Sequence, residues 1–281
     1  MTSVGVVGAG VMGAGIAQRC AMYGYPVILV DNQPGQLESA KSRIEQSLKK
    51  FVRKGRLSGE EERAALRNIE RCLQLERVGD CSLVVEAAPE NPDLKKKIFK
   101  ELDRICHSET LLASNTSSIP LTPLAETTRR PEQVLGIHFM NPVPIMKLVE
   151  MIRAKQTSDA AFQACKDFAL SLDCEVVESK DSPGFIINRI LIPMINEAIS
   201  VLEAGVASAE DIDRGMVLGT NQPMGPLALA DHIGLDVVLS ILQTLFREFG
   251  DGKYRPSPLL EDHVRQNRLG RKTGQGFYDY R

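Results

Sequence analysis

The sequence predicts an α/β protein: a Rossmann-like, doubly wound and mostly parallel sheet, followed by a smaller all-helical domain. Short β-branched runs alternate with helical segments as far as residue 179, and a glycine-rich turn joins the first strand to the first helix. The apolar spacing becomes helical after a turn-rich junction at 181–184. We therefore expect two domains, at residues 1–183 and 184–281.

In the first domain, strands and crossover helices are expected to alternate. The order strand, glycine turn, helix, strand is how a parallel sheet with crossover helices begins. Pro92 suits the first turn of its helix, where a missing N–H is tolerated. The predicted strands are residues 3–8, 26–31, 83–88, 111–115, 134–139, 147–152 and 175–179, and the predicted helices are 11–23, 35–55, 92–106 and 159–172.

The second domain is expected to be helical throughout. A long helix over 185–204 ends at Gly205, and Ser208 is placed to cap the next helix. Further helices are predicted within 226–249, before a basic, glycine-rich tail (LGRKTGQGFYDY).

Composition narrows the class of protein. The chain has 281 residues, 43% of them hydrophobic and 25% charged, which is enough for a substantial core. A net charge of −2 gives no indication of nucleic acid as a partner. No apolar run reaches the roughly 18 residues of a membrane span, and no signal peptide is recognised. The six cysteines have no metal-ligand spacing, so we expect reduced thiols, no metal and a cytoplasmic location.

Residues 8–13 (GAGVMG) form the glycine-rich turn. Their spacing fits G-x-G-x-x-G, whose glycines permit a tight turn, the approach of a pyrophosphate, and close packing of helix on strand. The N–H groups at the start of the helix favour bound phosphate. The residues predicted to bind a dinucleotide here are Gly8, Gly10, Val11, Met12 and Gly13.

Asp31 ends the second predicted strand, where an acidic residue is expected to bind the ribose 2′-hydroxyl of the cofactor. Because its charge would repel a 2′-phosphate, it favours NAD over NADP. A strand-capping role for Asp31, and a glycine turn without a nucleotide, are the alternatives.

Polar residues cluster after the late strands, where an open sheet places its ligand crevice: SNTSS at 114–118, HFMNP at 138–142, and Glu150. The imidazole of His138 can accept a hydroxyl proton while hydride leaves the same carbon. Glu150 follows twelve positions later, and neighbouring strands could bring its carboxylate to the other ring nitrogen. From spacing alone, a core histidine and an unrelated surface glutamate remain the alternative.

Six motifs in the same order, spread from about residue 3 to 281, resemble those of the 3-hydroxyacyl-CoA dehydrogenases. The resemblance is nearest to the short bacterial branch that acts on 3-hydroxybutyryl-CoA. It implies NAD-dependent, reversible oxidation of a short-chain (S)-3-hydroxyacyl-CoA by a homodimer that pairs through its helical domain. The motifs are GAGVMGAGIA, VEAAPEN, SNTSS, HFMNPVPIMKLVE, DSPGFIINRIL and GRKTGQGFYDY.

The resemblance also implies roles for individual residues. His138 matches the family's catalytic base and Glu150 its carboxylate partner, while Ser117 and Asn188 match residues that contact the substrate. Ser117 also matches a contact of the nicotinamide. Additional NAD contacts are implied at Glu90, Lys95, Asn141 and Lys272. Without the resemblance, Lys95 would be interpreted as one member of a solvated lysine run.

Coenzyme A carries phosphates, so its tail needs cations. Basic residues are concentrated at 49–56, and within this region Ser47 and Lys54 match the family's coenzyme A contacts. A solvated charged helix face is the alternative. Two other functions remain open: a sugar-acid (L-gulonate-type) NAD dehydrogenase on the same fold, and a catalytically silent NAD-binding protein.

Overall fold

The computed structural model describes all 281 residues. The chain divides into two compact units, Met1–Ser182 and Pro183–Arg281. Each unit has its own hydrophobic core, so each is described by itself.

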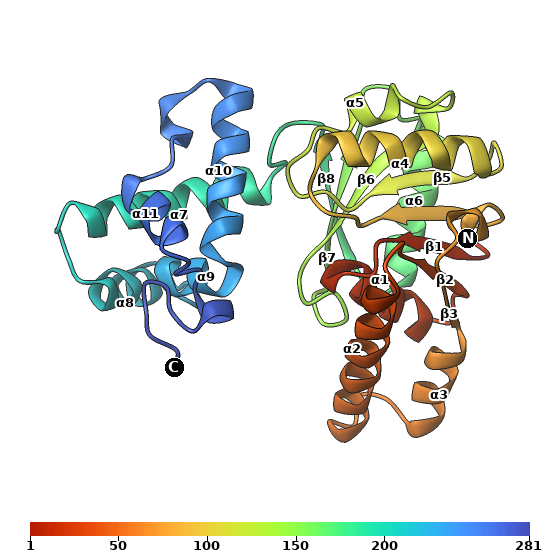
Figure 1. Cartoon of the computed structure of the whole chain (residues 1–281), viewed down its shortest axis with the longest axis horizontal. Coiled ribbons are helices and arrows are strands. Elements are labelled where there is room, and N and C mark those ends of the chain that lie inside the picture. The colour runs from red at the N-terminus through yellow and green to blue at the C-terminus, as the bar shows by residue number, and fades with distance from the viewer. The chain divides into compact units, whose positions relative to one another are not determined.

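The first unit is built on one eight-stranded sheet with the order β3-β2-β1-β4-β5-β6-β7-β8 (Figure 1). Strands β1 to β6 are parallel and have the doubly wound order. Strands β2 and β3 are added on one side of β1, and β4, β5 and β6 are added on the other. Strand β7 runs antiparallel to β6 and parallel to β8. The strands are β1 (Val4–Val7), β2 (Val27–Val30), β3 (Ile69–Cys72), β4 (Leu83–Glu86), β5 (Leu111–Ser114), β6 (Val134–Phe139), β7 (Leu148–Arg153) and β8 (Glu175–Lys180).

Helices pack on this sheet, and their apolar faces complete its core. Helix α1 begins directly after the glycine turn, and α2 and α3 lie beside it and beside one another (Figure 1). Ser58 caps α3 in a capping box with Glu61. The helices are α1 (Val11–Met22), α2 (Pro34–Arg53), α3 (Gly59–Arg67), α4 (Pro92–Ile105), α5 (Thr122–Ala125) and α6 (Asp159–Ser171).

Every strand and helix predicted for the first unit is present, and the fold class is confirmed. Strand β3 and helices α3 and α5 were not predicted. The sequence of β3, IERC, pairs only with β2 at the edge of the sheet, and none of its residues is fully buried. Such a strand has no apolar run, so periodicity alone does not indicate it.

The second unit is all-helical, as predicted. Its helices are α7 (Ile187–Glu203), α8 (Ala209–Thr220), α9 (Pro226–Ile233), α10 (Leu235–Phe249) and α11 (Pro258–Arg265). The predicted cap is confirmed, because the Ser208 hydroxyl accepts a hydrogen bond from the Asp211 N–H at 3.1 Å. The segment 226–249 forms two helices because Gly234 breaks it at φ +105°.

The basic tail has a structural role in this unit. The buried carboxylate of Asp231 on α9 accepts hydrogen bonds from the backbone N–H groups of Phe277 and Tyr278, both at 3.0 Å. A Cβ atom at Gly276 would lie 1.9 Å from the same carboxylate, so only glycine fits there. The glycines of the tail therefore allow it to pack closely on α9.

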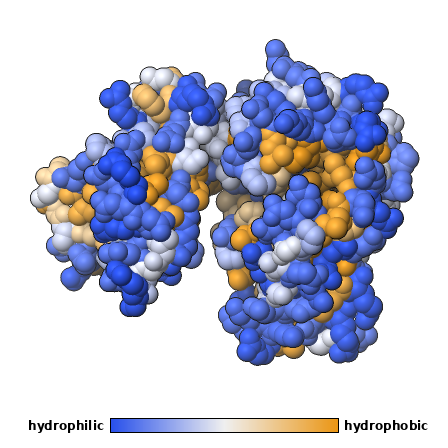
Figure 2. All heavy atoms as spheres, in the orientation of Figure 1, coloured by the Kyte–Doolittle hydropathy of each residue, from blue (hydrophilic) through white to orange (hydrophobic).

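No single helix is long and apolar enough to cross a membrane; α9 and α10 pass the test of length and composition only as a pair, bent by 97°. In Figure 2, hydrophobic side chains gather in a band on the visible face of the first unit, between the positions of α4 and α1 in Figure 1.

Candidate active site

The glycine turn has the close contacts that its spacing predicts. Gly8 has φ +104°, and a Cβ atom at Gly13 would lie 1.7 Å from the Gly8 carbonyl oxygen. A Cβ atom at Gly10 would meet nothing within 4 Å, so the backbone is open on that side. The turn therefore packs α1 tightly on β1 and leaves room for a phosphate beside the N-terminus of α1.

A cavity of about 530 Å³ opens at the ends of β1, β2 and β4. Its lining combines Gly8, Gly10 and Asp31 with apolar side chains such as Leu73 and Leu94. The Asp31 carboxylate accepts hydrogen bonds from the N–H groups of Ala9 at 2.8 Å and Gln33 at 2.9 Å, and this fixes its position on the cavity wall. The cavity fits an adenine dinucleotide: an apolar slot for a base, an acid for a ribose and a helix N-terminus for the phosphates.

His138 and Glu150 are direct partners across the antiparallel pair β6 and β7. The His138 Nδ1 and Glu150 Oε2 atoms are 3.0 Å apart, and both side chains are buried. Because a carboxylate accepts hydrogen bonds, Nδ1 carries the proton and Nε2 presents its lone pair. The structure thus brings together the two residues that spacing alone could not pair.

Ser117 completes this group. Its hydroxyl lies 3.1 Å from His138 Nε2 and is placed to donate to it. Glu90 in turn holds the loop that carries Ser117, because Oε1 accepts from the Ser117 N–H at 3.0 Å and the Ser118 N–H at 3.1 Å. Thr116 donates to the same oxygen from its hydroxyl at 2.6 Å. Glu90 therefore positions the serine loop, and its contact with NAD stays a prediction.

Lys95 is fully buried, so the alternative of a solvated lysine run is wrong for this residue. Its Nζ lies 2.7 Å from Glu86 Oε1 and 3.5 Å from Glu90 Oε2. Glu86 is also fully buried, and its other carboxylate oxygen accepts from the Ser114 hydroxyl at 2.6 Å. The ammonium is thus surrounded by protein acceptors, including the Ala88 carbonyl at 3.2 Å. A direct contact of Lys95 with NAD stays a prediction.

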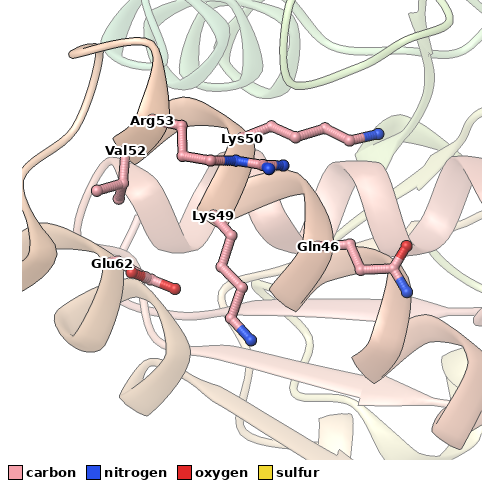
Figure 3. A pocket seen from close by; sticks show the side chains of 6 residues that line it. All are labelled: Gln46, Lys49, Lys50, Val52, Arg53 and Glu62. Atoms are coloured by element: carbon pink, nitrogen blue, oxygen red, sulfur yellow. The ribbon is translucent and has the colours of Figure 1, made fainter.

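The basic end of α2 also forms a pocket, of about 460 Å³. Figure 3 shows Lys49, Lys50 and Arg53 projecting from α2, with Glu62 on α3. Ser47 and Lys54 do not line this pocket. They lie seven positions apart, about two helical turns, so Ser47 and the cap residue Lys54 share one side of the helix. Their contact with coenzyme A stays a prediction.

Three further predicted residues are described only by their local surroundings. Asn141 is exposed just after β6. Asn188 is half-buried in the first turn of α7 in the second unit. Lys272, also in the second unit, forms an ion pair with Asp236. The roles of these three residues in binding stay predictions.

Sequence reasoning gave no role to Glu86 or Asn115. The Asn115 side-chain oxygen accepts from the Phe139 N–H at 2.9 Å, which fixes the end of β6 next to His138. A polar residue that ends an otherwise apolar strand, as Glu86 does in LVVE, is the signal that could have identified the first of them.

The six cysteines are free thiols, and Cys72 alone is not buried. Burial raises the pKa of Cys20, Cys106 and Cys165 to about 12, so these thiols stay protonated at neutral pH. We expect iodoacetamide at pH 8 to alkylate Cys72 first and the others slowly, because the thiolate is the nucleophile. Mass spectrometry over time checks this. All six should react at once in guanidinium chloride, and equally fast native reaction would contradict the prediction.

Two family models of known proteins match the chain, one for each of its two units. Residues 3–182 match the family model of the 3-hydroxyacyl-CoA dehydrogenase NAD binding domain, and residues 184–280 match the model of the C-terminal domain. A 3-hydroxybutyryl-CoA dehydrogenase of Bradyrhizobium diazoefficiens is 50% identical over 99% of this chain and 95% of its own. The human mitochondrial hydroxyacyl-coenzyme A dehydrogenase is 42% identical over 99% of this chain and 91% of its own.

A solved structure of a related enzyme has the same fold as this chain. The crystal structure of (S)-3-hydroxybutyryl-CoA dehydrogenase from Ralstonia eutropha superposes with a TM-score of 0.96 at 46% identity, covering 100% of this chain and 99% of the other. The resemblance that the six motifs carried is confirmed. The chain is therefore an enzyme of the 3-hydroxyacyl-CoA dehydrogenase family.

Proposed function

We propose that the protein catalyses reversible, NAD-dependent oxidation of a short-chain (S)-3-hydroxyacyl-CoA, with 3-hydroxybutyryl-CoA as the leading substrate. The observation that carries the proposal is the Glu150–His138–Ser117 chain of hydrogen bonds beside a dinucleotide cavity. The naming of its full-length relatives as 3-hydroxybutyryl-CoA dehydrogenases supports the choice of substrate over a sugar acid. The intact acid–base pair argues against a catalytically silent protein.

In this mechanism His138 is the acid–base group. Its Nε2 accepts the proton of the substrate 3-hydroxyl, and Glu150 balances the imidazolium charge through Nδ1. Ser117 orients the hydroxyl beside Nε2, and Asn188 is proposed to hold the acyl portion. The bound NAD supplies the acceptor for the hydride from C3. In the reverse direction, protonated His138 returns its proton to the ketone oxygen.

The cofactor is held by the cavity at the ends of β1, β2 and β4. Gly8, Gly10 and Gly13 allow the pyrophosphate to approach α1, and Val11 and Met12 add first-turn N–H groups. Asp31 would bind the adenosine ribose. Glu90, Lys95, Asn141 and Lys272 complete the proposed set of contacts, while Ser47 and Lys54 are proposed for coenzyme A.

Initial rates test the substrate. We expect acetoacetyl-CoA to be reduced faster than the C6 and C10 3-ketoacyl-CoA substrates, and NADH to be used in preference to NADPH. Free 3-hydroxybutyrate and L-gulonate, offered with NAD, serve as the controls. Oxidation of L-gulonate without any reaction of the thioesters would overturn the proposal.

Asp31 sets the cofactor preference in this proposal. Asp31→Asn removes the charge but keeps an oxygen that can accept the Ala9 N–H. We expect the KM for NADH to rise about 10-fold or more, because a hydrogen bond to a charged group is lost, and the preference over NADPH to fall. Glu38→Gln, which neutralises an exposed acid on α2, is the control. An unchanged ratio of NADH to NADPH rates in Asp31→Asn would exclude this role.

The proposal includes a homodimer paired through the second unit. Large hydrophobic side chains are exposed on it, among them Ile190, Val206 and Leu218 at 67–72%. Light scattering at high concentration should show a dimer, and a strictly monomeric species would contradict it. A cytoplasmic location is also proposed, supported by six free thiols in a single chain.

A further inference from the structure

The side chain of Arg19 joins the cofactor-binding helix to the loop between the two acid–base residues. Arg19 lies in the last turn of α1, and only 3% of it is exposed. The loop, residues 140–147, connects β6, which carries His138, to β7, which carries Glu150. The glycine turn, at the other end of α1, belongs to the dinucleotide cavity.

All five hydrogen bonds of the Arg19 guanidinium go to backbone carbonyl oxygens. Nη1 donates to Val143 at 3.1 Å and to Met146 at 2.9 Å, both in the loop. Nε donates to Leu172 at 3.1 Å, and Nη2 donates to Leu172 at 2.7 Å and to Asp173 at 3.0 Å, in the turn before β8. One buried cation thus connects α1 to the segments that precede β7 and β8.

Arg19 supplies the hydrogen bonds that two of the loop carbonyls accept. Inside the loop, the N–H groups of Ile145 and Met146 both bond back to the Pro142 carbonyl at 3.0 Å. That leaves the carbonyls of Val143 and Met146 to the guanidinium. The nearest acidic side chain in the turn, Asp173, pairs instead with Lys147 at 2.9 Å. The guanidinium forms no salt bridge with a carboxylate, and its five hydrogen bonds all act on the position of the backbone.

The same face of α1 touches the loop a second time. Gly15 lies one helical turn before Arg19, and a Cβ atom there would come within 3.0 Å of the Val143 Cβ. Glycine at this position lets α1 approach the loop, and Arg19 then holds the loop in place. Any shift of α1 is consequently passed on to the segment between His138 and Glu150.

We propose that Arg19 is a positioning residue, which fixes the His138–Glu150 pair relative to the cofactor held at the start of α1. The inference rests on the proposed function, in which His138 exchanges a proton while hydride moves to or from the cofactor. Both transfers must occur at one carbon, and a misplacement of about 1 Å can cost on the order of 10²-fold in rate. A buried cross-link between the two parts of the site controls that distance.

The experiment compares two buried arginines. Arg130 also donates to backbone carbonyls, those of Cys106 at 3.0 Å and Asp103 at 2.7 Å, but it lies on no segment of the proposed site. Each arginine is changed to methionine and to lysine, and kcat, KM and NADH affinity are measured at a temperature where every variant is folded. The lysine variants keep the charge, so they supply the comparison if a methionine variant does not fold.

We expect Arg19→Met to lower kcat by about 10- to 100-fold with little change in the KM for acetoacetyl-CoA. Arg19→Lys should fall between it and the wild type, because one ammonium cannot reach both carbonyl groups of the loop and both of the turn. The Arg130 variants should lose thermal stability without a comparable loss of kcat. A kcat for Arg19→Met near that of the wild type, or equal losses in the Arg19 and Arg130 variants, would overturn the proposal.

A double-mutant cycle separates this proposal from the proposed function. If Arg19 acts through His138, adding Arg19→Met to His138→Asn should cost much less than Arg19→Met costs alone. Full additivity would show a general structural effect and refute the positioning role. Normal turnover in His138→Asn alone would instead refute the proposed function, and fluorescence titration with NADH would still report how Arg19 affects the cofactor site.

Discussion

Replacing His138 with asparagine is expected to lower turnover by roughly 10²–10⁴-fold, the range typical for loss of general acid–base catalysis. Asparagine is smaller than histidine, but its amide N–H can take the place of Nδ1 and still donate to Glu150, so the fold should remain intact. It cannot take up the substrate proton, because its amide is not basic at neutral pH. The measurement is steady-state reduction of acetoacetyl-CoA by NADH, with circular dichroism as the check on folding.

The control for this variant is His107→Asn. His107 lies in the same unit but is exposed and paired with Asp80 at 3.0 Å, so its replacement should leave turnover unchanged. Near wild-type turnover in a folded His138→Asn protein would remove His138 from the mechanism. Glu150→Gln should also slow the reaction, because the amide cannot balance the charge of the imidazolium.

Replacing Lys95 with methionine is expected to reduce the free energy of unfolding by about 3–5 kcal/mol. The loss arises because Glu86 is fully buried and its carboxylate would lose the ammonium that lies 2.7 Å away. Methionine fills a similar volume, so a cavity contributes little to the effect. Urea denaturation followed by fluorescence or circular dichroism measures the change.

Two further variants make the cause of this loss testable. Lys97→Met changes an exposed lysine on the same helix and should stay within about 0.5 kcal/mol of the wild type. Adding Glu86→Gln to Lys95→Met removes the unpaired charge and should recover part of the lost stability. A Lys95→Met protein as stable as Lys97→Met would show that the buried ion pair contributes nothing to folding.

Lys95 and His138 differ in how well the sequence predicts their contacts. His138 and Glu150 stand in two neighbouring predicted strands, which could bring their side chains together, but only the resemblance of the motifs implied that they are partners. Lys95 stands in a run of three lysines, a local pattern typical of a solvated helix face. Its burial depends on Glu86 and Glu90, which reach it only after β4 and α4 have packed.

The contacts of Arg19 are even harder to predict from the local sequence. The carbonyls that it binds belong to residues 124 to 154 positions later in the chain. Backbone acceptors have no sequence signature, because every residue carries a carbonyl. Strand β3 was missed for a related reason, since its position at the sheet edge requires no apolar pattern. Motifs therefore predict the chemistry well, while tertiary packing determines the residues that support it.

The pairing of His138 with Glu150 across one antiparallel ladder bears on how this enzyme can diversify. The proposed acid–base pair is encoded within one short continuous segment, since its two residues are twelve positions apart. The cofactor cavity, by contrast, is assembled from stretches that follow four separate strands, β1 to β4. If the proposed roles hold, a mutation at Asp31 would alter the choice of nucleotide and leave the β6–β7 pair, which carries His138 and Glu150, unchanged. In the proposed mechanism, the choice of nucleotide and the proton transfer therefore depend on different parts of the fold, and selection could change one without the other.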